Sequence, residues 1–366
     1  MTLDTSKVKK VNQNNVFTYI YKNKIVNKAM ICDNLNMCLS TVNSNLKNLE
    51  QLGVIKKNGF FESTGGRKSD QIEINVIHKC SIGIAILKNK VHIVATNLYC
   101  ETLYKEIINV NYSDSDEYYM QLSNLLNDFI TKNNIDNNII LGVSVATQGL
   151  VIDQKVTYSK VMGNSNMSAS KLKEFIKYDL HLEHDSKCAA DLSLWKHNFV
   201  NGCVLLLNNN LGSAIIVDKK IIGGLSGTIE HYHLDNDNLC YCGNRGCFET
   251  ICSVSSLEAR SGLSITNFFS ELRNNNSNMA IIWKEYLDTL STVINNINYV
   301  IDGTLVLSGQ LSSFLIPSDI KYIFDNVSKL SPFRINDDFI ITSDSGEFTQ
   351  AIGAALYFIK EFISTI

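Results

Sequence analysis

The 366-residue sequence predicts an α/β protein preceded by a smaller, mainly helical unit. From Cys80 onward, apolar runs of strand length alternate with segments of helical period, which is typical of sheets covered by helices. Before residue 76, three helix-like segments precede a stretch of alternating residues with glycine-containing turns. The chain is too long for one compact core, so we expect two or three domains.

The amino-terminal unit begins with two short helical patterns, "NVFTYIY" (15–21) and "NKAMICDNLNM" (27–37). A longer one, "LSTVNSNLKNLEQLGVI" (39–55), has Ser40 as its expected N-cap and Gly53 as its expected end. Its predicted apolar face consists of Leu39, Val42, Leu46, Leu49 and Leu52. Two short helices before a third with a polar outer face are typical of a helix-turn-helix, whose last helix can enter the major groove of DNA.

The polar side chains of this third helix are of types that contact bases and phosphates. The candidates for DNA contact on it are Ser40, Thr41, Asn43, Ser44, Asn45 and Lys47. The hairpin-like stretch that follows has expected turns at Asn58-Gly59 and Gly65-Gly66. It adds four cations for phosphates or the minor groove, Lys56, Lys57, Arg67 and Lys68. Together these features predict a winged helix-turn-helix.

The charge distribution agrees with a DNA-binding head. Residues 1–75 contain eleven lysines and arginines against six aspartates and glutamates, whereas residues 76–366 contain 22 against 30. A basic head on an acidic body is expected to meet a polyanion such as double-stranded DNA. The alternative is a three-helix packing module, or a wing that docks onto protein.

The body, residues 76–366, alternates strands and helices. Strands are expected near 80–87, 91–98, 139–146, 203–207, 213–218, 304–309 and 339–342. Helices are expected near 117–132, 169–180, 187–198, 280–299, 318–329 and 348–363. Glycine-containing turns such as "NNNLGSA" (208–214) follow strands, which is where α/β folds bind small molecules.

The sequence contains no apolar run of the roughly 20 residues that cross a membrane, and its first thirty residues have no apolar signal core. We therefore expect a cytoplasmic protein without a membrane partner. The ten cysteines are not spaced like a disulfide framework, so most are expected to be small buried residues.

Three cysteines nevertheless cluster in "CYCGNRGCFET" (240–250), shortly after His231 and His233. Zinc takes four nitrogen or sulfur ligands in a tetrahedron, so three cysteines and one histidine predict a closed, structural zinc site. The glycines at 243 and 246 would let the backbone fold around the ion. Residue pattern alone does not choose between the two histidines, and buried thiols without a metal are the alternative.

The wing "STGGRK", the segment "EHDSKCAADLSLW" (183–195) and the knuckle "IEHYHLDNDNLCYCGNRGCFET" (229–250) together resemble the ROK family of repressors, open reading frames and kinases, in its xylose-repressor-like branch. The resemblance covers essentially the whole chain. It implies an actin-like, sugar-kinase-type body of two lobes with a sugar cleft between them. The implied domains are a DNA-binding head (1–75), a first lobe (76–190) to which a last helix (348–366) returns, and a second lobe with the knuckle (191–347).

Several residue roles follow from this resemblance. The family's zinc ligands fall on His231, Cys240, Cys242 and Cys247, with His233 as a substitute for the histidine. The family's sugar-contacting residues fall on Asp185, His231 and Glu249, and His184 replaces an asparagine beside Asp185. Asp185 would accept a sugar hydroxyl.

The resemblance also has two departures. Kinases of the family open the first lobe with Asp-x-Gly-Gly-Thr, which holds ATP phosphate, whereas the segment 83–89 has no acid and no paired glycines. Phosphoryl transfer depends on positioning phosphates and metal, so no catalytic residue is assigned and an enzyme is not expected. A glutamate that binds sugar hydroxyls in the family is Thr228 here, although Glu230 is close by in the sequence.

The leading hypothesis is a sugar-responsive DNA-binding transcriptional regulator of carbohydrate genes, acting as a repressor. It would bind an operator as a homodimer or dimer of dimers and sense a sugar or sugar derivative. The alternatives are a sugar kinase with an appended head, and a ligand-blind repressor whose body serves only for dimerisation.

Overall fold

The computed structural model describes residues 5–62, 68–163, 166–223 and 228–366. In the described part of the head, helices pack on a small antiparallel sheet of strand order β1-β3-β2. The helices are α1 (Thr5–Asn23), α2 (Lys28–Leu35) and α3 (Leu39–Gln51), and the strands are β1 (Ile25–Val26), β2 (Ile55–Phe60) and β3 (Asp70–Ile74). Phe17, Val42, Leu49 and Ile72 are buried together in the head core.

The ends of α3 differ from the sequence prediction. Cys38 is the N-cap, without a side-chain capping bond, so the expectation of Ser40 at that position is wrong. Ser40 lies within the first turn, with its Oγ 3.2 Å from Cys38 Sγ. Leu39 and Leu52 are 55% and 52% exposed, because the interior leucines and valine of α3 already cover α1 and the sheet. The apolar face of α3 is therefore shorter than predicted.

The expected turn at Asn58-Gly59 is also wrong, because β2 continues through these two residues. The pairing register between β2 and β3 shifts between Lys57 and Phe60, and Gly59 has a φ of +91°. A glycine at positive φ inside a strand is typical of a β-bulge. The second expected turn, Gly65-Gly66, lies outside the described residues.

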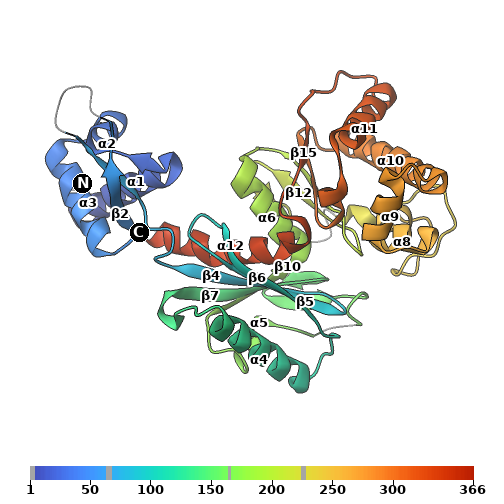
Figure 1. Cartoon of the computed structure of the whole chain (residues 1–366), viewed down its shortest axis with the longest axis horizontal. Helices are drawn as coiled ribbons and strands as arrows, with labels where there is room; N and C mark the ends of the chain where they lie inside the picture. Colours follow the sequence, from blue (N-terminus) through green and yellow to red (C-terminus); the bar gives the residue numbers. More distant parts are fainter. Residues whose placement is uncertain (1–4, 63–67, 164–165, 224–227) are drawn as a thin grey trace.

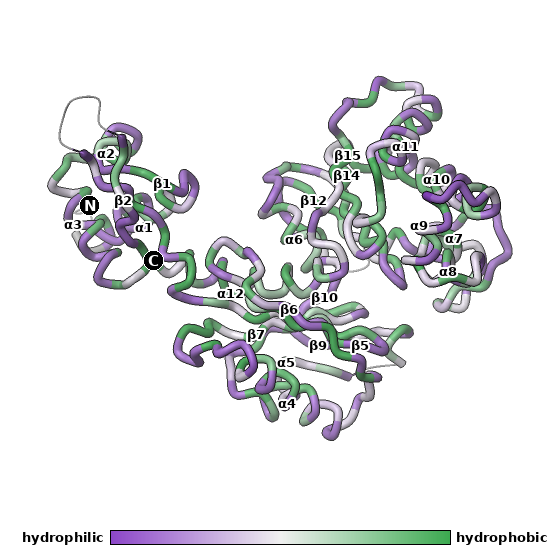
Figure 2. The backbone as a smooth tube through the Cα atoms, viewed as in Figure 1, coloured by the Kyte–Doolittle hydropathy of each residue, from purple (hydrophilic) through white to green (hydrophobic). Residues whose placement is uncertain are grey.

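In the first lobe, the described strands form a mixed sheet of order β10-β7-β4-β5-β6. They are β4 (Cys80–Ile86), β5 (Lys90–Thr96), β6 (Thr102–Asn109), β7 (Ile140–Thr147) and β10 (Leu180–His184). The first three form an antiparallel meander, and β7 and β10 add in parallel beside β4. Helices α4 (Asp116–Lys132) and α5 (Ala169–Lys173) cover one face, and β8 (Leu150–Ile152) pairs with β9 (Lys155–Tyr158) in a separate hairpin. Figure 2 shows hydrophilic and hydrophobic residues alternating along α4, as an amphipathic covering helix requires.

The second lobe repeats this topology. Its described sheet has the order β13-β12-β11-β14-β15, in which a meander is again followed by two parallel strands on the other side of its first strand. The strands are β11 (Gly202–Leu206), β12 (Gly212–Val217), β13 (Lys220–Ile221), β14 (Thr304–Ser308) and β15 (Ile340–Thr342). The α-helices are α7 (Glu249–Cys252), α8 (Val254–Ser261), α9 (Ile265–Arg273), α10 (Ser277–Asn298) and α11 (Pro317–Leu330). This duplication was not predicted from the sequence.

Two helices cross between the lobes (Figure 1). Helix α6 (Asp185–His197) follows the last strand of the first lobe, yet its Ala189 and Ala190 pack on the second-lobe sheet. Helix α12 (Thr349–Thr365) follows the second lobe, yet it packs on Ala85 and Ala146 of the first-lobe sheet. The two helices also contact each other. The sheet of each lobe is therefore covered by a helix that directly follows the other lobe in the chain.

The alternating α/β pattern predicted for the body is confirmed. One helical assignment, 169–180, is wrong in its second half, because α5 ends at Lys173 and β10 begins at Leu180. In the body, helices α7, α8 and α9 and strands β6, β8, β9, β10 and β13 were not predicted. Among the described residues, no helix is long and apolar enough to cross a membrane.

The head contacts the body through α1. The Tyr21 hydroxyl donates to the Leu98 carbonyl oxygen at 2.5 Å, and the Gln13 side-chain amide donates to the Ile366 carbonyl oxygen at 3.3 Å. Ile366 is buried in the head core, and Figure 1 shows the carboxyl terminus beside the head. The carboxyl-terminal residue is therefore part of the head's packing.

Candidate functional site

A cavity of about 480 Å³ lies between the two lobes. Its wall comes from the ends of β7, β9 and β10, the start of α6, the turn between β11 and β12, and the segment that leads into the cysteine cluster. The lining residues are Gln148, Gly149, Leu150, Tyr158, Ser159, Lys160, Val161, His184, Asp185, Ser186, Asn210, Leu211, Gly212, Thr228, Glu230, His231 and Tyr241. A volume of this size suits a small-molecule ligand.

Asp185 is the first residue of α6 and is almost fully buried in this wall. The Ser186 hydroxyl donates to Asp185 Oδ1 at 3.3 Å, and His184 Nε2 lies 3.4 Å from the same oxygen. The positive end of the helix dipole favours a carboxylate at this position. A Cβ on Gly212 would lie 2.2 Å from Ser186 Oγ, so the glycine at the start of β12 lets the second lobe approach Asp185.

His184 precedes Asp185 and lines the same cavity. Burial lowers the pKa of His184, although the neighbouring Asp185 acts in the opposite direction. The imidazole is therefore neutral near pH 7 and has one donor and one acceptor nitrogen. His184 and Asp185 together offer hydroxyl groups both kinds of hydrogen-bond partner.

Glu230 lines the cavity, whereas Glu249 lies behind its wall. Glu230 accepts from the Ser213 hydroxyl at 2.8 Å, and burial raises the pKa of Glu230 to about 8. Glu249 accepts from the Leu211 amide at 2.6 Å and the Asn210 side chain at 3.0 Å, and burial raises its pKa to about 7. Glu249 thus supports the turn that lines the cavity, and its expected contact with a sugar stays a prediction.

The structure gathers His231, Cys240, Cys242 and Cys247, whose ligand atoms all lie within 4.8 Å of one another. His231 Nδ1 lies 3.8 Å from Cys240 Sγ, and the Sγ atoms of Cys242 and Cys247 are 3.7 Å apart. A tetrahedral zinc ion with Zn–S bonds of about 2.3 Å would separate two sulfurs by about 3.8 Å. The donor set and its spacing therefore fit zinc. His233 is exposed outside the cluster, with Nδ1 3.1 Å from the Arg245 carbonyl oxygen.

Two glycines shape the loop around these sulfurs, as the sequence suggested. Gly243 has a φ of +95° and Gly246 a φ of +79°, both in the left-handed region. A Cβ on Gly246 would also lie 2.6 Å from the Leu234 carbonyl oxygen. The Lys160 ammonium donates to the Cys242 carbonyl oxygen at 2.6 Å, so the loop is tied to the first lobe at the rim of the cavity.

A metal ion would also complete the chemistry of the cluster. Burial raises the pKa of Cys240, which keeps this thiol protonated in the absence of a cation. Zinc binding replaces such thiol protons, and its free energy then contributes to folding of the loop. His231 Nε2 lies on the other side of the ring, 3.5 Å from the Tyr241 hydroxyl, where both groups line the cavity.

The head carries a second hollow, of about 140 Å³, between α2, α3 and the β2–β3 sheet. Four of its lining residues are lysines, Lys28, Lys47, Lys56 and Lys57. Lys56 Nζ lies 3.1 Å from Glu73, and Lys57 Nζ lies 3.7 Å from Asp70. Exposed ion pairs of this kind contribute little to stability, so the lysines can exchange them for phosphate oxygens.

Most of the expected DNA-contacting residues lie on the surface of the head. Those of α3 that are exposed or half-buried are Ser40, Thr41, Asn43, Ser44 and Lys47, and Lys68 is exposed on the hairpin. Asn45 is the exception: it is buried and its side chain donates to the Thr41 carbonyl oxygen at 3.0 Å, so its predicted place on the outer face is wrong. Arg67 lies outside the described residues.

Sequence reasoning missed Lys28 of the head hollow and the cavity residues Lys160 and Tyr241. They are single polar residues in separate loops, and no motif groups them. Gln148 and Asn210 lie in the glycine-containing turns 146–150 and 208–214, which were expected from the sequence to bind a small molecule.

The arrangement of the body defines a class of protein. Two mixed sheets of equal topology, joined by crossing helices around a polar cleft, form a sugar-kinase-like fold. The chain belongs to the ROK family, which matches residues 81–361.

Three named relatives are similar over most of this chain. The xylose repressor of Staphylococcus xylosus is 23% identical over 354 residues, which is 89% of each chain. The xylose repressor of Caldicellulosiruptor bescii is 24% identical over 68% of this chain, and the match covers 65% of that protein, slightly less than two thirds. The DNA-binding transcriptional dual regulator NagC of Escherichia coli is 24% identical over 69% of this chain and 65% of its own length.

Two crystal structures show the same fold. A ROK family transcriptional regulator homologous to the E. coli MLC protein superimposes with a TM-score of 0.70 and 15% identity, over 98% of this chain and 97% of that one. A ROK family glucokinase from Streptomyces griseus, bound to glucose and AMPPNP, superimposes with a TM-score of 0.65 and 15% identity, over 75% of this chain and 98% of that one.

Proposed function

We propose that this protein is a sugar-responsive DNA-binding transcriptional regulator that represses carbohydrate genes. The observation that carries the proposal is the basic hollow of the head in the same chain as a ROK body with a polar cavity. In this proposal residues 1–75 are the DNA-binding domain, residues 76–190 with helix 348–366 form one lobe, and residues 191–347 form the other. The relatives named as a xylose repressor and as a DNA-binding transcriptional dual regulator support the regulatory role.

The head is proposed to be a winged helix-turn-helix. Helix α3 would enter the major groove, where exposed Asn43, Ser44 and Lys47 meet base edges. Lys56, Lys57 and Lys28 would bind phosphate, with Arg67 as a further expected contact on the wing. Asn45 is left out of this interface because it is buried.

The cavity is proposed to bind a sugar or sugar derivative. Asp185 and His184 would bind hydroxyls, and His231 would add a contact through the nitrogen that faces the cavity. Glu230, which the resemblance left undecided, joins them because it lines the wall. The names of the relatives include xylose, which makes xylose the first sugar to examine.

Zinc is proposed as a structural cofactor held by His231, Cys240, Cys242 and Cys247. With four protein ligands the site is closed, so zinc would supply loop rigidity and not Lewis-acid catalysis. The rigid loop would keep Tyr241 and His231 in the cavity wall.

A sugar kinase is the second candidate. Asp185 is a carboxylate buried in the cleft, where it could accept the proton of a sugar hydroxyl, and the fold resembles that of a glucokinase. Against it, the turn after β4 reads Leu87-Lys88-Asn89 and offers no acid for a metal. We therefore propose a body without catalysis. If the wild-type protein turned over ATP with a hexose and Asp185→Asn lost that turnover, this proposal would be contradicted.

The deciding experiment is fluorescence anisotropy with duplexes that tile the DNA upstream of the gene, at about 0.15 M salt, with and without pooled sugars. Tight binding of one duplex that a sugar pool changes is expected. Specific binding that no sugar changes would favour the ligand-blind repressor. Binding without sequence preference would contradict the regulator.

Head variants make the result specific. Lys56→Gln with Lys57→Gln should weaken binding to all duplexes and lower the magnitude of the slope of log affinity against log salt by about 2 for each bound head. Asn43→Ala should cost roughly 1–3 kcal/mol on the preferred duplex and less on others. Lys132→Gln, on the far side of the first lobe, is the matched control and should change neither. A two-fold symmetric operator would support the proposed homodimer or dimer of dimers.

A further inference from the structure

A further cavity, of about 300 Å³, has no lining residue in common with the sugar cavity. Its walls come from the first-lobe sheet, from the crossing helices α6 and α12, and from Ile221 of β13 in the second lobe. We call it the crossing-helix cavity. None of the roles proposed above uses the residues that line it.

The sheet contributes three polar side chains to this cavity, Ser144, His181 and Glu183. Ser144 of β7 pairs in register with His181 of β10, and side chains in register lie on the same face of a sheet. Glu183 comes two residues after His181 and therefore lies on that face as well. From α6 the cavity receives Lys187 and Asp191, which are neighbours at a spacing of four residues.

Ser144 indicates that the cavity takes a polar ligand. It is 0% exposed in the middle of a buried strand, and its Oγ has no hydrogen-bond partner among the described residues. An alanine at this position would avoid the cost of burying an unpartnered hydroxyl. A ligand atom in the cavity that hydrogen-bonds Ser144 would remove that cost.

His181 offers a second unpartnered atom beside the first. Its ring stacks on the Tyr357 ring of α12, with centroids 3.6 Å apart and an interplanar angle of 3°, so the imidazole is held in place. Its Nδ1 is buried and has no partner in the described part of the chain. Burial lowers the pKa of His181, so the ring is neutral near pH 7 and Nδ1 can present a lone pair.

The charges around His181 favour a cation. The carboxylates of Glu183, Glu361 and Asp191 all act on its ring. Two lysines balance them in part, because Lys187 Nζ lies 3.3 Å from Glu183 and Lys360 Nζ lies 2.7 Å from Asp191. Three carboxylates against two ammonium groups leave the surroundings of the cavity with a net negative charge.

The cation is not a metal ion. Among the described residues, the histidine, cysteine and acidic side chains close enough to share one ion are those of the zinc cluster, which lies elsewhere. The acceptors of the crossing-helix cavity are instead a hydroxyl, an imidazole nitrogen and a carboxylate on one sheet face. An ammonium group has three N–H donors, and its number of donors matches these three acceptors.

We propose that the crossing-helix cavity binds the ammonium group of a small primary amine. The ammonium would donate to Ser144 Oγ, to His181 Nδ1 and to the Glu183 carboxylate. Its carbon chain would lie against Ile221 and Ala354, which line the cavity as well. This proposal does not rest on the sugar cavity or on DNA binding.

The test is isothermal titration calorimetry of the full-length, zinc-loaded protein with three amines, n-butylamine, ethanolamine and putrescine. Their neutral analogues, 1-butanol, ethylene glycol and 1,4-butanediol, are titrated in parallel. At least one amine is expected to bind at one site per chain, about tenfold or more tightly than its analogue, because charge-assisted hydrogen bonds are about twice as strong as neutral ones.

Two variants locate the binding. Ser144→Ala should weaken the amine about tenfold, the effect of losing one hydrogen bond to a charged group. Its melting temperature should not fall, because the hydroxyl that it removes has no protein partner, whereas loss of a structural role would lower it. Asp191→Asn should also weaken the amine. Asp325→Asn is the matched control, because Asp325 is likewise a helix carboxylate paired with a lysine, and it should change nothing.

Three results would overturn the proposal. Alcohols that bind as tightly as the amines would show that the ammonium charge is not recognised. Amine binding that Ser144→Ala and Asp191→Asn leave unchanged would place the amine at other carboxylates. If none of the three amines bound, the cavity would not be an amine site. Each of these results would leave the sugar-responsive regulator untouched.

Discussion

His231 and His233 are two residues apart, yet only His231 lies within reach of the three cysteine sulfurs. We predict that His231→Ala and Cys242→Ser each lower the zinc content well below one ion per chain and lower the melting temperature. The loss follows because a structural site needs all four ligands, and its binding energy is folding energy. His233→Ala should keep a full ion.

Zinc content by mass spectrometry, with thermal melts in the presence and absence of a chelator, measures this prediction. The wild-type protein and His233→Ala should both lose stability on chelation. If His233→Ala lost zinc and His231→Ala kept it, the assignment of the ligand would be reversed.

His92 makes stability depend on pH. Burial lowers its pKa to about 4, and nearby Lys90 acts in the same direction, against the opposite effect of the Glu347 carbonyl. A histidine in the unfolded chain has a pKa near 6.5, so the unfolded state binds more protons between these values. The contribution of neutral His92 to the free energy of unfolding is therefore complete above pH 6.5. It decreases as the pH falls toward 4, by about 3 kcal/mol at most.

The measurement is the urea midpoint of wild-type protein and His92→Gln from pH 4.5 to 7.5. The difference between them should narrow or reverse as the pH falls, because only the wild-type protein must protonate the buried ring. Acid release of zinc affects both proteins and cancels in the comparison. The exposed His197→Gln is the control. Parallel pH curves for His92→Gln and wild-type protein would refute this account.

At the scale of elements, α12 depends on two glycines for its close packing. A Cβ on Gly353 would lie 2.0 Å from the Cys188 carbonyl oxygen of α6, and one on Gly83 of β4 would lie 1.8 Å from the Ala351 carbonyl oxygen. These contacts explain glycines in the interior of a helix and a strand. They also give Gly83 a packing role that is independent of phosphate binding.

We predict that Gly353→Ala destabilises the protein even though alanine is the better helix former by about 1 kcal/mol. Overpacking against backbone costs typically 1–3 kcal/mol, which exceeds the gain in helix propensity. The comparison is the midpoint of chemical unfolding. Gly223→Ala is the control, because nothing lies within 4 Å of the Cβ it would add, and it should be close to neutral. A Gly353→Ala variant as stable as wild type would show that α6 and α12 can separate at no cost.

The elements that could be predicted from the sequence were those whose signal is local. Helices α4 and α10 were expected within a few residues because their apolar spacing is regular. The segment 174–180 was wrongly predicted to be helical and β10 was not predicted, because β10 is defined by parallel pairing with distant β7, which leaves no local pattern. The same distinction holds for the sites. The metal ligands lie within 17 residues and were predicted as a group, whereas the cavity collects residues from Gln148 to Tyr241 that only the fold brings together.

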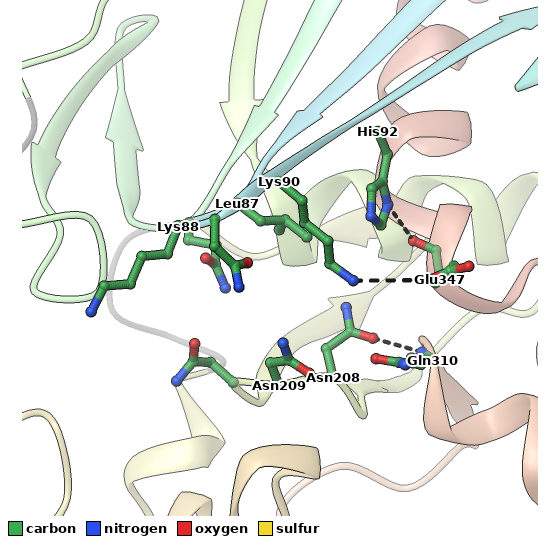
Figure 3. A pocket seen from close by; sticks show the side chains of 11 residues that line it. Leu87, Lys88, Lys90, His92, Asn208, Asn209, Gln310 and Glu347 are labelled. Carbon is green, nitrogen blue, oxygen red and sulfur yellow. Dashed lines mark hydrogen bonds and ion pairs between the residues drawn. The ribbon is translucent and has the colours of Figure 1, made fainter. Parts of the chain in front are cut away.

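At the scale of the whole molecule, α12 connects the cleft with the head. The short helix η4 (Gly346–Phe348) directly before it supplies Glu347 to the wall of a small cavity between the lobes (Figure 3), and the chain ends at Ile366 in the head core. A helix of 17 residues spans about 25 Å. Helix α12 is a rigid element, so a change in lobe closure can move the head through it.

We predict that Tyr21→Phe combined with deletion of Ile366 uncouples the head from the cleft, because it removes the hydroxyl bond to Leu98 and the carboxyl-terminal contact with Gln13. Coupling between two sites typically changes affinity by 5–150-fold. In the wild-type protein, the sugar that alters operator affinity should do so by such a factor, and operator DNA should alter the affinity for that sugar equally. In the variant, operator and ligand should both still bind, but neither should change the affinity for the other.

Tyr178→Phe, which removes a hydroxyl from the surface of the first lobe, is the control. Anisotropy with labelled operator and calorimetry with the ligand measure the two halves of the linkage, and an unchanged factor in the variant would show that the signal reaches the head by contacts other than these.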